Sequence, residues 1–174
     1  MCKYHVYDVL IFDLGNTILP IAPELTIRKF QHLGFQENIL NPSKIVRKNL
    51  SDYQKGEIET ADFLAHLELL EDLQKTHQLI LLSNTNALHT ASFEAKALKF
   101  SKPLSSYFDA VYYSQEVGMS KPDAAIYKYV HQKHSLHNKK VLFLDDLSEN
   151  LVVPKRLGWE VVQISKEKTI LDLR

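Results

Sequence analysis

The sequence is poor in cysteine and has no excess of either charge. Cys2 is the only cysteine among 174 residues, which excludes a disulfide framework or a thiolate zinc site within one chain. Lys plus Arg and Asp plus Glu number 21 each, so the formal net charge is zero. General nucleic-acid binders usually carry a basic excess or a basic stripe. We therefore expect no nucleic-acid partner.

The chain also lacks a long hydrophobic run. No apolar stretch reaches the roughly 18–20 residues that a membrane helix needs. Residues 1–8 do not have the layout of a signal peptide. We therefore expect no membrane partner and a cytoplasmic location. Hydrophobic residues make up 45% of the chain and charged residues 24%, which is typical of a soluble globular domain.

Short apolar runs indicate an α/β protein. Five runs rich in β-branched and aromatic residues predict strands; they are residues 9–12, 79–82, 110–113, 141–144 and 161–164. Residues 122–134 and 149–157 have helical periodicity, with Pro154 interrupting the second segment and Gly158 following it as a stop. Alternation of helices with continuous apolar strands implies a doubly wound parallel sheet that helices cover on both faces.

The spacing of these elements predicts a second, smaller unit. Residues 14–78 separate the first two strands, which is more than one crossover needs, and much of this stretch has helical character. We predict an α/β core of residues 1–20 and 68–174. Residues 21–67 are then a small helical cap, shorter than usual, over the C-terminal edge of the sheet. Thr60 is expected to open a helix.

Polar groups follow four of the predicted strands. They are Asp13 after the first, Ser83 and Asn84 after the second, Lys121 after the third, and Asp145 and Asp146 after the fourth. The carboxyl ends of parallel strands lie on one edge of a sheet, so these groups should converge there. Carboxylates can hold Mg²⁺ or act as nucleophiles. Cations, hydroxyls and amides can bind phosphate oxygens. Together they are what phosphoryl transfer requires.

These motifs, in this order, resemble the haloacid dehalogenase-like (HAD) superfamily of phosphotransferases, and they span nearly the whole chain. Residues 12–16, 82–86 and 114–122 are further similar to the bacterial alpha-D-glucose-1-phosphatase branch. The resemblance implies a Rossmann-like core with strand order 3-2-1-4-5. It also implies an Mg²⁺-dependent phosphatase that acts on a small phosphorylated metabolite, with sugar phosphates as candidates.

The resemblance gives the acids their roles. Asp13 is implied to attack phosphorus in line and to form an aspartyl-phosphate. Mg²⁺ is implied to sit between Asp13, the carbonyl oxygen of Gly15 and Asp146, and Asp145 would orient or assist this group of ligands.

The phosphate-binding groups follow from the same resemblance. Lys121 is implied to neutralise phosphate charge and to hold Asp13 ionised. Ser83 and Asn84 are implied to bind phosphate oxygens. Asn150 is expected to support the fourth motif rather than to touch substrate.

Gly15 departs from the superfamily pattern. Phosphatases of the superfamily usually carry a second aspartate at this position, which protonates the leaving oxygen. Asn16 is not a simple substitute, because an amide has no useful pKa and the neighbouring position is expected to point elsewhere. General acid–base catalysis contributes ~10²–10⁴-fold, so its loss matters most for poor leaving groups.

Gly15 therefore leaves two other functions open. One, which Pro154 and the short cap also favour, is a catalytically weak or inactive HAD-like protein that senses or binds phosphate. The other is metal-free dehalogenation of 2-haloacids, against which the adjacent Asp145 and Asp146 argue. The histidines add no further site, because His131, His134 and His137 have the spacing of a solvated helix face rather than of metal ligands.

Overall fold

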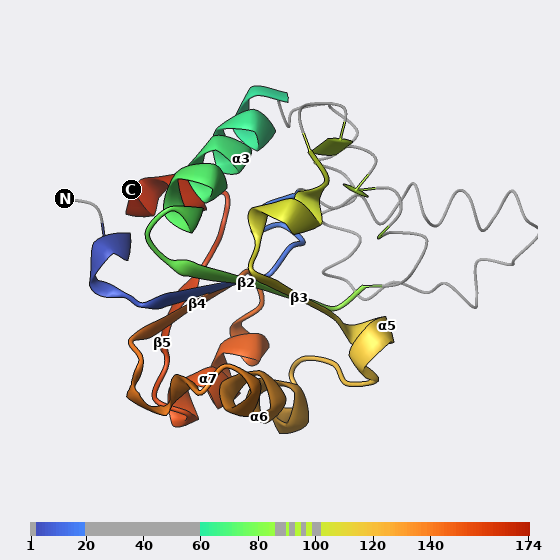
Figure 1. Cartoon of the computed structure of the whole chain (residues 1–174), viewed down its shortest axis with the longest axis vertical. Helices are drawn as coiled ribbons and strands as arrows, with labels where there is room; N and C mark the ends of the chain where they lie inside the picture. Colours follow the sequence, from blue (N-terminus) through green and yellow to red (C-terminus); the bar gives the residue numbers. More distant parts are fainter. Residues whose placement is uncertain (1–2, 20–59, 86–89, 91–92, 95–96, 99–101) are drawn as a thin grey trace, which may run out of the picture.

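A five-stranded parallel sheet lies at the centre of the computed structural model (Figure 1). The structure describes residues 3–19, 60–85, 90, 93–94, 97–98 and 102–174. The strands are β1 (Val9–Phe12), β2 (Gln78–Ser83), β3 (Ala110–Tyr113), β4 (Val141–Asp145) and β5 (Glu160–Gln163). Their order is β3-β2-β1-β4-β5, and every neighbouring pair is parallel. The predicted fold class and strand order are confirmed.

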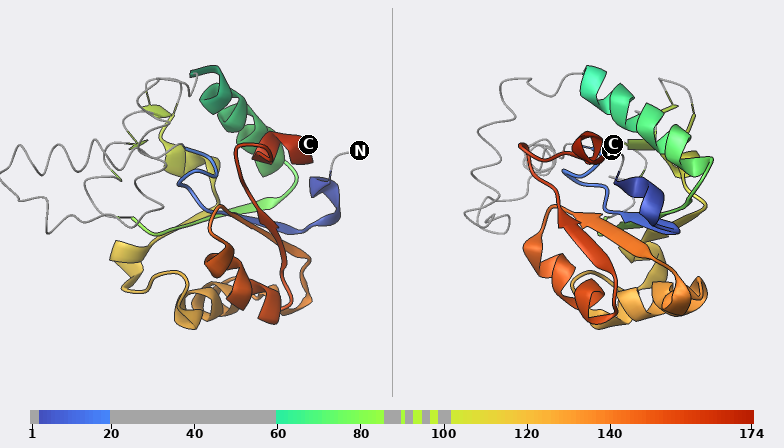
Figure 2. Two further views of the ribbon diagram at one scale, coloured as in Figure 1. Left: turned by 180° about the vertical axis from the view of Figure 1, so that it is seen from behind. Right: turned by 90° about the vertical axis from the view of Figure 1, so that its left-hand side faces the viewer.

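Helices cover both faces of this sheet, as the views in Figure 2 also show. The α-helices are α3 (Thr60–Gln74), α5 (Ser114–Val117), α6 (Ala124–Lys133) and α7 (Val152–Arg156). The 3-10 turns are η1 (Tyr4–Val6), η3 (Leu104–Tyr107), η4 (Leu136–Asn138), η5 (Ser148–Leu151) and η6 (Ile170–Leu173). The helix α3 lies on one side of the sheet, and α6 and α7 lie on the other.

Alternating side chains in β1 give each layer its own core. Successive residues of a strand point to opposite faces. Leu10 and Phe12 therefore pack in the cluster that contains the buried residues of α3, whereas Val9 and Ile11 pack in the cluster that contains those of α6. All four side chains are fully buried. The two layers hold β1 in the middle of the sheet, with its carboxyl end fixed.

The chain around Pro154 shows how one residue sets a boundary. The predicted helix at residues 149–157 is divided into the turn η5 and the short helix α7. Pro154 lies in the first turn of α7, where its missing N–H would have had no helical acceptor. Gly158 follows the helix with φ of +82°, a conformation that favours glycine. The predicted interruption and stop are both present.

The predicted cap falls mainly on residues 20–59, which lie outside the described residues. The helix α3 runs without a break across the predicted boundary between residues 67 and 68. The cap and its boundaries stay a prediction. None of the helices in the described part of the chain is long and apolar enough to cross a membrane.

Two of the three histidines near the end of α6 are half-buried, so the predicted solvated face is wrong for them. His131 Nδ1 accepts a hydrogen bond from Trp159 Nε1 at 3.0 Å, and His134 Nε2 lies 2.7 Å from the Tyr112 hydroxyl. Burial lowers the pKa of both imidazoles. His137 is exposed as expected. The rings of His131 and His134 pack against Trp159 and Tyr112 on the α6 side of the sheet.

Candidate active site

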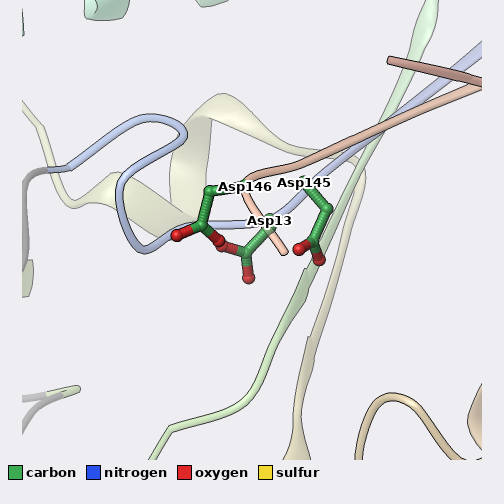
Figure 3. Close-up of side chains that lie close together, drawn as sticks. All are labelled: Asp13, Asp145 and Asp146. Atoms are coloured by element: carbon green, nitrogen blue, oxygen red, sulfur yellow. The ribbon is translucent and has the colours of Figure 1, made fainter. Parts of the chain in front are cut away.

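Three carboxylates meet at the C-terminal edge of the sheet. Asp13 follows β1, Asp145 ends β4, and Asp146 comes directly after it. One carboxylate oxygen from each lies within 4.8 Å of the others, and Figure 3 shows the carboxylates of Asp13 and Asp146 pointing toward one another. The register explains the meeting, because Phe12 pairs with Leu144 and the two strands end at the same level.

Lys121 joins two of these carboxylates. Its Nζ lies 2.6 Å from Asp13 Oδ1 and 2.6 Å from Asp145 Oδ2. The residue comes from the segment between α5 and α6 and is only 4% exposed. Burial alone would disfavour the ammonium, but Asp13 and Asp145 outweigh it and hold the pKa of Lys121 above its usual value. The site therefore contains a fixed positive charge next to Asp13.

Acids still outnumber bases in this cluster. When all groups are ionised, three carboxylates face one ammonium and leave two negative charges uncompensated. Burial raises the pKa of Asp13 to about 7 against the lowering effect of Lys121, and Asp145 adds to the rise. Burial also raises the pKa of Asp146. The cluster has the charge to accept a divalent cation.

Asp145 is fully buried, and both its oxygens already accept hydrogen bonds. Oδ1 accepts from the backbone N–H of Leu147 at 2.9 Å and from Asn150 Nδ2 at 2.9 Å. Oδ2 accepts from Lys121 Nζ and, at 3.0 Å, from Asn150 Nδ2. Tyr127 donates in turn to the backbone carbonyl of Asn150 at 2.9 Å. Asn150 thus lies in the supporting position expected from the sequence, and Asp145 is held in place for Lys121.

Asn16 contacts the site, which the sequence reasoning missed. Its Nδ2 donates to Asp146 Oδ2 at 3.0 Å. Its φ is +53°, and asparagine is among the residues that best tolerate this left-handed conformation. The turn is closed by a hydrogen bond from Asn16 N to the carbonyl of Leu19 at 2.6 Å, and Gly15 and Leu19 form a parallel bridge. The dipeptide Gly15-Asn16 was the available signal for such a turn.

The residues after β2 lie at the same edge of the sheet. Ser83 ends β2, the neighbour of β1, and is 3% exposed. Asn84 follows it, and its side-chain amide contacts the backbone of Lys121 through two hydrogen bonds of 2.7 and 2.9 Å. The structure therefore brings the predicted second and third motifs into direct contact.

A family model matches most of the chain that follows Asp13. The model of the haloacid dehalogenase-like hydrolases matches residues 21–164. The chain belongs to the haloacid dehalogenase-like hydrolase family. The predicted superfamily is therefore confirmed, whereas the narrower similarity to the glucose-1-phosphatase branch stays a prediction.

Curated and solved members of this family include phosphatases and magnesium-bound enzymes. The chain is 28% identical to D-ribitol-5-phosphate phosphatase of Bacteroides thetaiotaomicron over 88% of this chain and 90% of that protein. A HAD family enzyme of the same organism, in its magnesium complex, superposes with a TM-score of 0.72 at 23% identity, covering 97% and 100% of the two chains. The complex of that enzyme with magnesium and inorganic phosphate superposes with a TM-score of 0.63 at 23% identity, covering 90% of this chain and 93% of the other. The expectation of a HAD-like hydrolase of the phosphatase type is confirmed.

The donor set of this HAD-like site fits Mg²⁺. Mg²⁺ prefers hard oxygen ligands and is usually held by one or two carboxylates together with substrate phosphate. Asp13 and Asp146 supply such oxygens beside two uncompensated negative charges. The backbone carbonyl of Gly15 comes from the same turn. Asp145 differs from the other two acids, because four hydrogen bonds already engage its oxygens.

Proposed function

We propose that this protein is an Mg²⁺-dependent phosphatase that hydrolyses small phosphorylated metabolites, sugar or alditol phosphates among them, through an aspartyl-phosphate on Asp13. The observation that carries the proposal is Lys121, whose buried ammonium contacts Asp13 at 2.6 Å inside a cluster with two further acids. The similarity to a ribitol-5-phosphate phosphatase supports the substrate class. The magnesium and phosphate bound to a relative of the same fold support the ligands.

Each side chain then has a chemical task. An ionised Asp13 oxygen attacks phosphorus while the bond from phosphorus to the ester oxygen breaks. Lys121 favours the ionised form of Asp13 and faces the negative charge of the phosphoryl oxygens. The hydroxyl of Ser83 donates to one of these oxygens. Water then attacks the phosphorus of the acyl phosphate, which releases inorganic phosphate and regenerates the Asp13 carboxylate.

The metal would be held by Asp13, Asp146 and the carbonyl of Gly15. When bound, Mg²⁺ would neutralise charge on the phosphoryl oxygens as phosphorus is transferred. Asp145 serves this site indirectly, because its oxygens hold Lys121 and accept from Asn150. Asn16 holds the Asp146 carboxylate through the hydrogen bond of 3.0 Å.

Gly15 provides no side chain that could protonate the leaving oxygen. The departing oxygen must then take its proton from water, which suits leaving groups of low basicity. Loss of an acid–base residue costs about 10²–10⁴-fold for substrates that need one. We therefore propose a phosphatase that favours good leaving groups, such as an anomeric hydroxyl or p-nitrophenol, over simple primary alcohols.

A screen for phosphate release tests the proposed function. We expect release from p-nitrophenyl phosphate and from members of a panel of sugar and alditol phosphates. EDTA should abolish this release, and added Mg²⁺ should restore it. A sugar 1-phosphate should be cleaved faster than ribitol 5-phosphate if the leaving group decides the rate. Turnover that is indifferent to EDTA would contradict the proposed metal.

The absence of an acid at Gly15 also favours a second candidate function. A member without acid–base catalysis could bind Mg²⁺ and phosphate and turn over nothing. In that case Mg²⁺ together with inorganic phosphate would raise the melting temperature, yet no substrate in the panel would release phosphate above the level of a heat-inactivated sample. This result would mean that the protein binds phosphate without hydrolysing phosphate esters.

Replacement of Asn16 tests the proposed metal ligand Asp146. We expect Asn16→Gly to weaken Mg²⁺ affinity by about tenfold or more, because hydrogen bonds that orient a metal ligand typically contribute 10–100-fold. Glycine tolerates the φ of +53°, so the turn should survive. Isothermal titration with Mg²⁺ measures the change.

Ser135→Gly is the matched control for this prediction. Ser135 has a similar φ of +51° and lies at the amino end of η4, so the substitution changes backbone freedom in the same way without touching the acids. Its Mg²⁺ affinity should equal that of the wild type. Equal affinity in Asn16→Gly would show that the amide does not support a metal ligand.

A further inference from the structure

Asn84 engages both polar groups of one peptide backbone position. Its Oδ1 accepts from the backbone N–H of Lys121 at 2.9 Å, and its Nδ2 donates to the backbone carbonyl of Lys121 at 2.7 Å. A side-chain amide has one acceptor oxygen and two N–H donors. The oxygen and one N–H of Asn84 are thus directed at the main chain of Lys121.

A second reciprocal pair lies beside the first. The backbone N–H of Thr85 donates to Ser114 Oγ at 3.1 Å, and Ser114 Oγ lies 3.2 Å from the carbonyl oxygen of Thr85, to which it donates. The segment after β2 is therefore joined to the segment after β3 at two successive residues. Only the pair made by Asn84 reaches Lys121.

The backbone of Lys121 lies in a turn, which the hydrogen bond from the N–H of Asp123 to the carbonyl of Ser120 closes at 3.0 Å. The residue lies between the end of α5 at Val117 and the start of α6 at Ala124, outside both helices and the sheet. Its ammonium must nevertheless reach two carboxylates at 2.6 Å each while 4% of the residue is exposed. A shift of this backbone would move the ammonium away from Asp13.

We propose that Asn84 is a positioning residue, which sets the backbone of Lys121 and so places its ammonium between Asp13 and Asp145. This role of the side chain is separate from the phosphate contact expected at Asn84, which the backbone amides after Ser83 can supply. The effect on phosphate rests on the proposed function, whereas the effect on Lys121 does not. The two effects can be measured separately.

Chemical labelling of Lys121 measures its placement without substrate or metal. Reductive methylation followed by peptide mass spectrometry should find Lys121 protected in the wild type, because its ammonium is buried and paired. In Asn84→Ala we expect labelling to be faster by about tenfold or more, as expected when two hydrogen bonds of ordinary net strength are lost.

Ser114→Ala is the matched control for labelling. It removes the neighbouring reciprocal pair between the same two segments but leaves Asn84 and Lys121 in contact. Its Lys121 should stay as protected as in the wild type. Equal protection in Asn84→Ala, or equal exposure in both variants, would overturn the positioning role.

A double-mutant cycle separates positioning from phosphate contact. Affinity for inorganic phosphate with Mg²⁺ is measured in the wild type, Asn84→Ala, Lys121→Met and the double variant. If Asn84 acts through Lys121, Asn84→Ala weakens binding in the wild type and has no further effect in Lys121→Met. An equal loss in both backgrounds would mean direct contact and overturn the proposal. If the wild type binds no phosphate, the proposed function fails, and the labelling result still decides the role of Asn84.

Discussion

Asp13→Asn is expected to reduce phosphate release by about 10³-fold or more, since the nucleophile of a covalent mechanism cannot be replaced by water at comparable rate. Asparagine has the size of aspartate but no anionic oxygen to attack phosphorus. The substitution also leaves Lys121 its second partner, Asp145, at 2.6 Å. Because burial opposes the charge of Asp13, whose pKa it raises to about 7, the neutral variant should fold at least as stably as the wild type.

The substitution Asp13→Asn should lower kcat and not merely raise KM. Asp123→Asn provides the matched control, because Asp123 caps the start of α6 by accepting from the N–H of Ala125 at 3.0 Å, and asparagine caps equally well. That variant should keep wild-type turnover and stability. Residual activity in Asp13→Asn near the wild-type level would remove Asp13 from the nucleophile position.

Lys121→Met is expected to cost about 3–5 kcal/mol of unfolding free energy near neutral pH, the usual cost of leaving buried charges without their partner. Lys121 is the cation that contacts both Asp13 and Asp145, whose side chains are 10% and 0% exposed. Methionine is one atom shorter than lysine and keeps an apolar side chain that can pack near the ring of Phe143. The loss is therefore electrostatic. Urea unfolding at several pH values measures it.

The destabilisation should shrink as the pH falls. Burial already raises the pKa of Asp13 to about 7, and loss of Lys121 removes an influence that lowers it. The folded pKa then lies above the unfolded value of about 3.9, so the folded state binds a proton that the unfolded state has released. Stability is consequently lost as the pH rises through this window. Lys121→Met should come closer to the wild type at pH 5 than at pH 8.

A second substitution tests whether unpaired charge causes the destabilisation in Lys121→Met. Asp13→Asn added to Lys121→Met removes one of the stranded charges, and we expect it to recover part of the lost stability at pH 8 and little at pH 5. A penalty of equal size at both pH values, unchanged by Asp13→Asn, would show that Lys121 stabilises the fold through packing rather than charge.

The strands could be predicted because each contains a short apolar run, and the runs of β1 and β4 are buried throughout. The predicted segment 9–12 coincides with β1, and 161–164 differs from β5 by one residue. The acids were predictable for the same reason, since their place follows from where a buried strand ends. Parallel strand ends share one edge, so position in the sequence alone brings Asp13 and Asp146 together.

The contacts of Asn16 and Asn84 could not be predicted, because they depend on three-dimensional positions that no periodicity encodes. Asn16 reaches Asp146 across 130 positions of sequence and Asn84 reaches Lys121 across 37. Both asparagines lie just beyond the end of a strand, where the backbone leaves the regular pattern of the strand. The half-buried position of His131 could not be predicted either, since only the folded structure brings Trp159 into contact with it.

The most direct test of the central claim is to trap the intermediate. Wild-type protein is mixed with Mg²⁺ and a substrate from the screen, quenched in acid during turnover and treated with borohydride, which reduces an aspartyl-phosphate to homoserine. Peptide mass spectrometry should find homoserine at position 13, and only when substrate was present. Continued phosphate release with aspartate unchanged at position 13, or with the reduced residue at another position, would contradict the account.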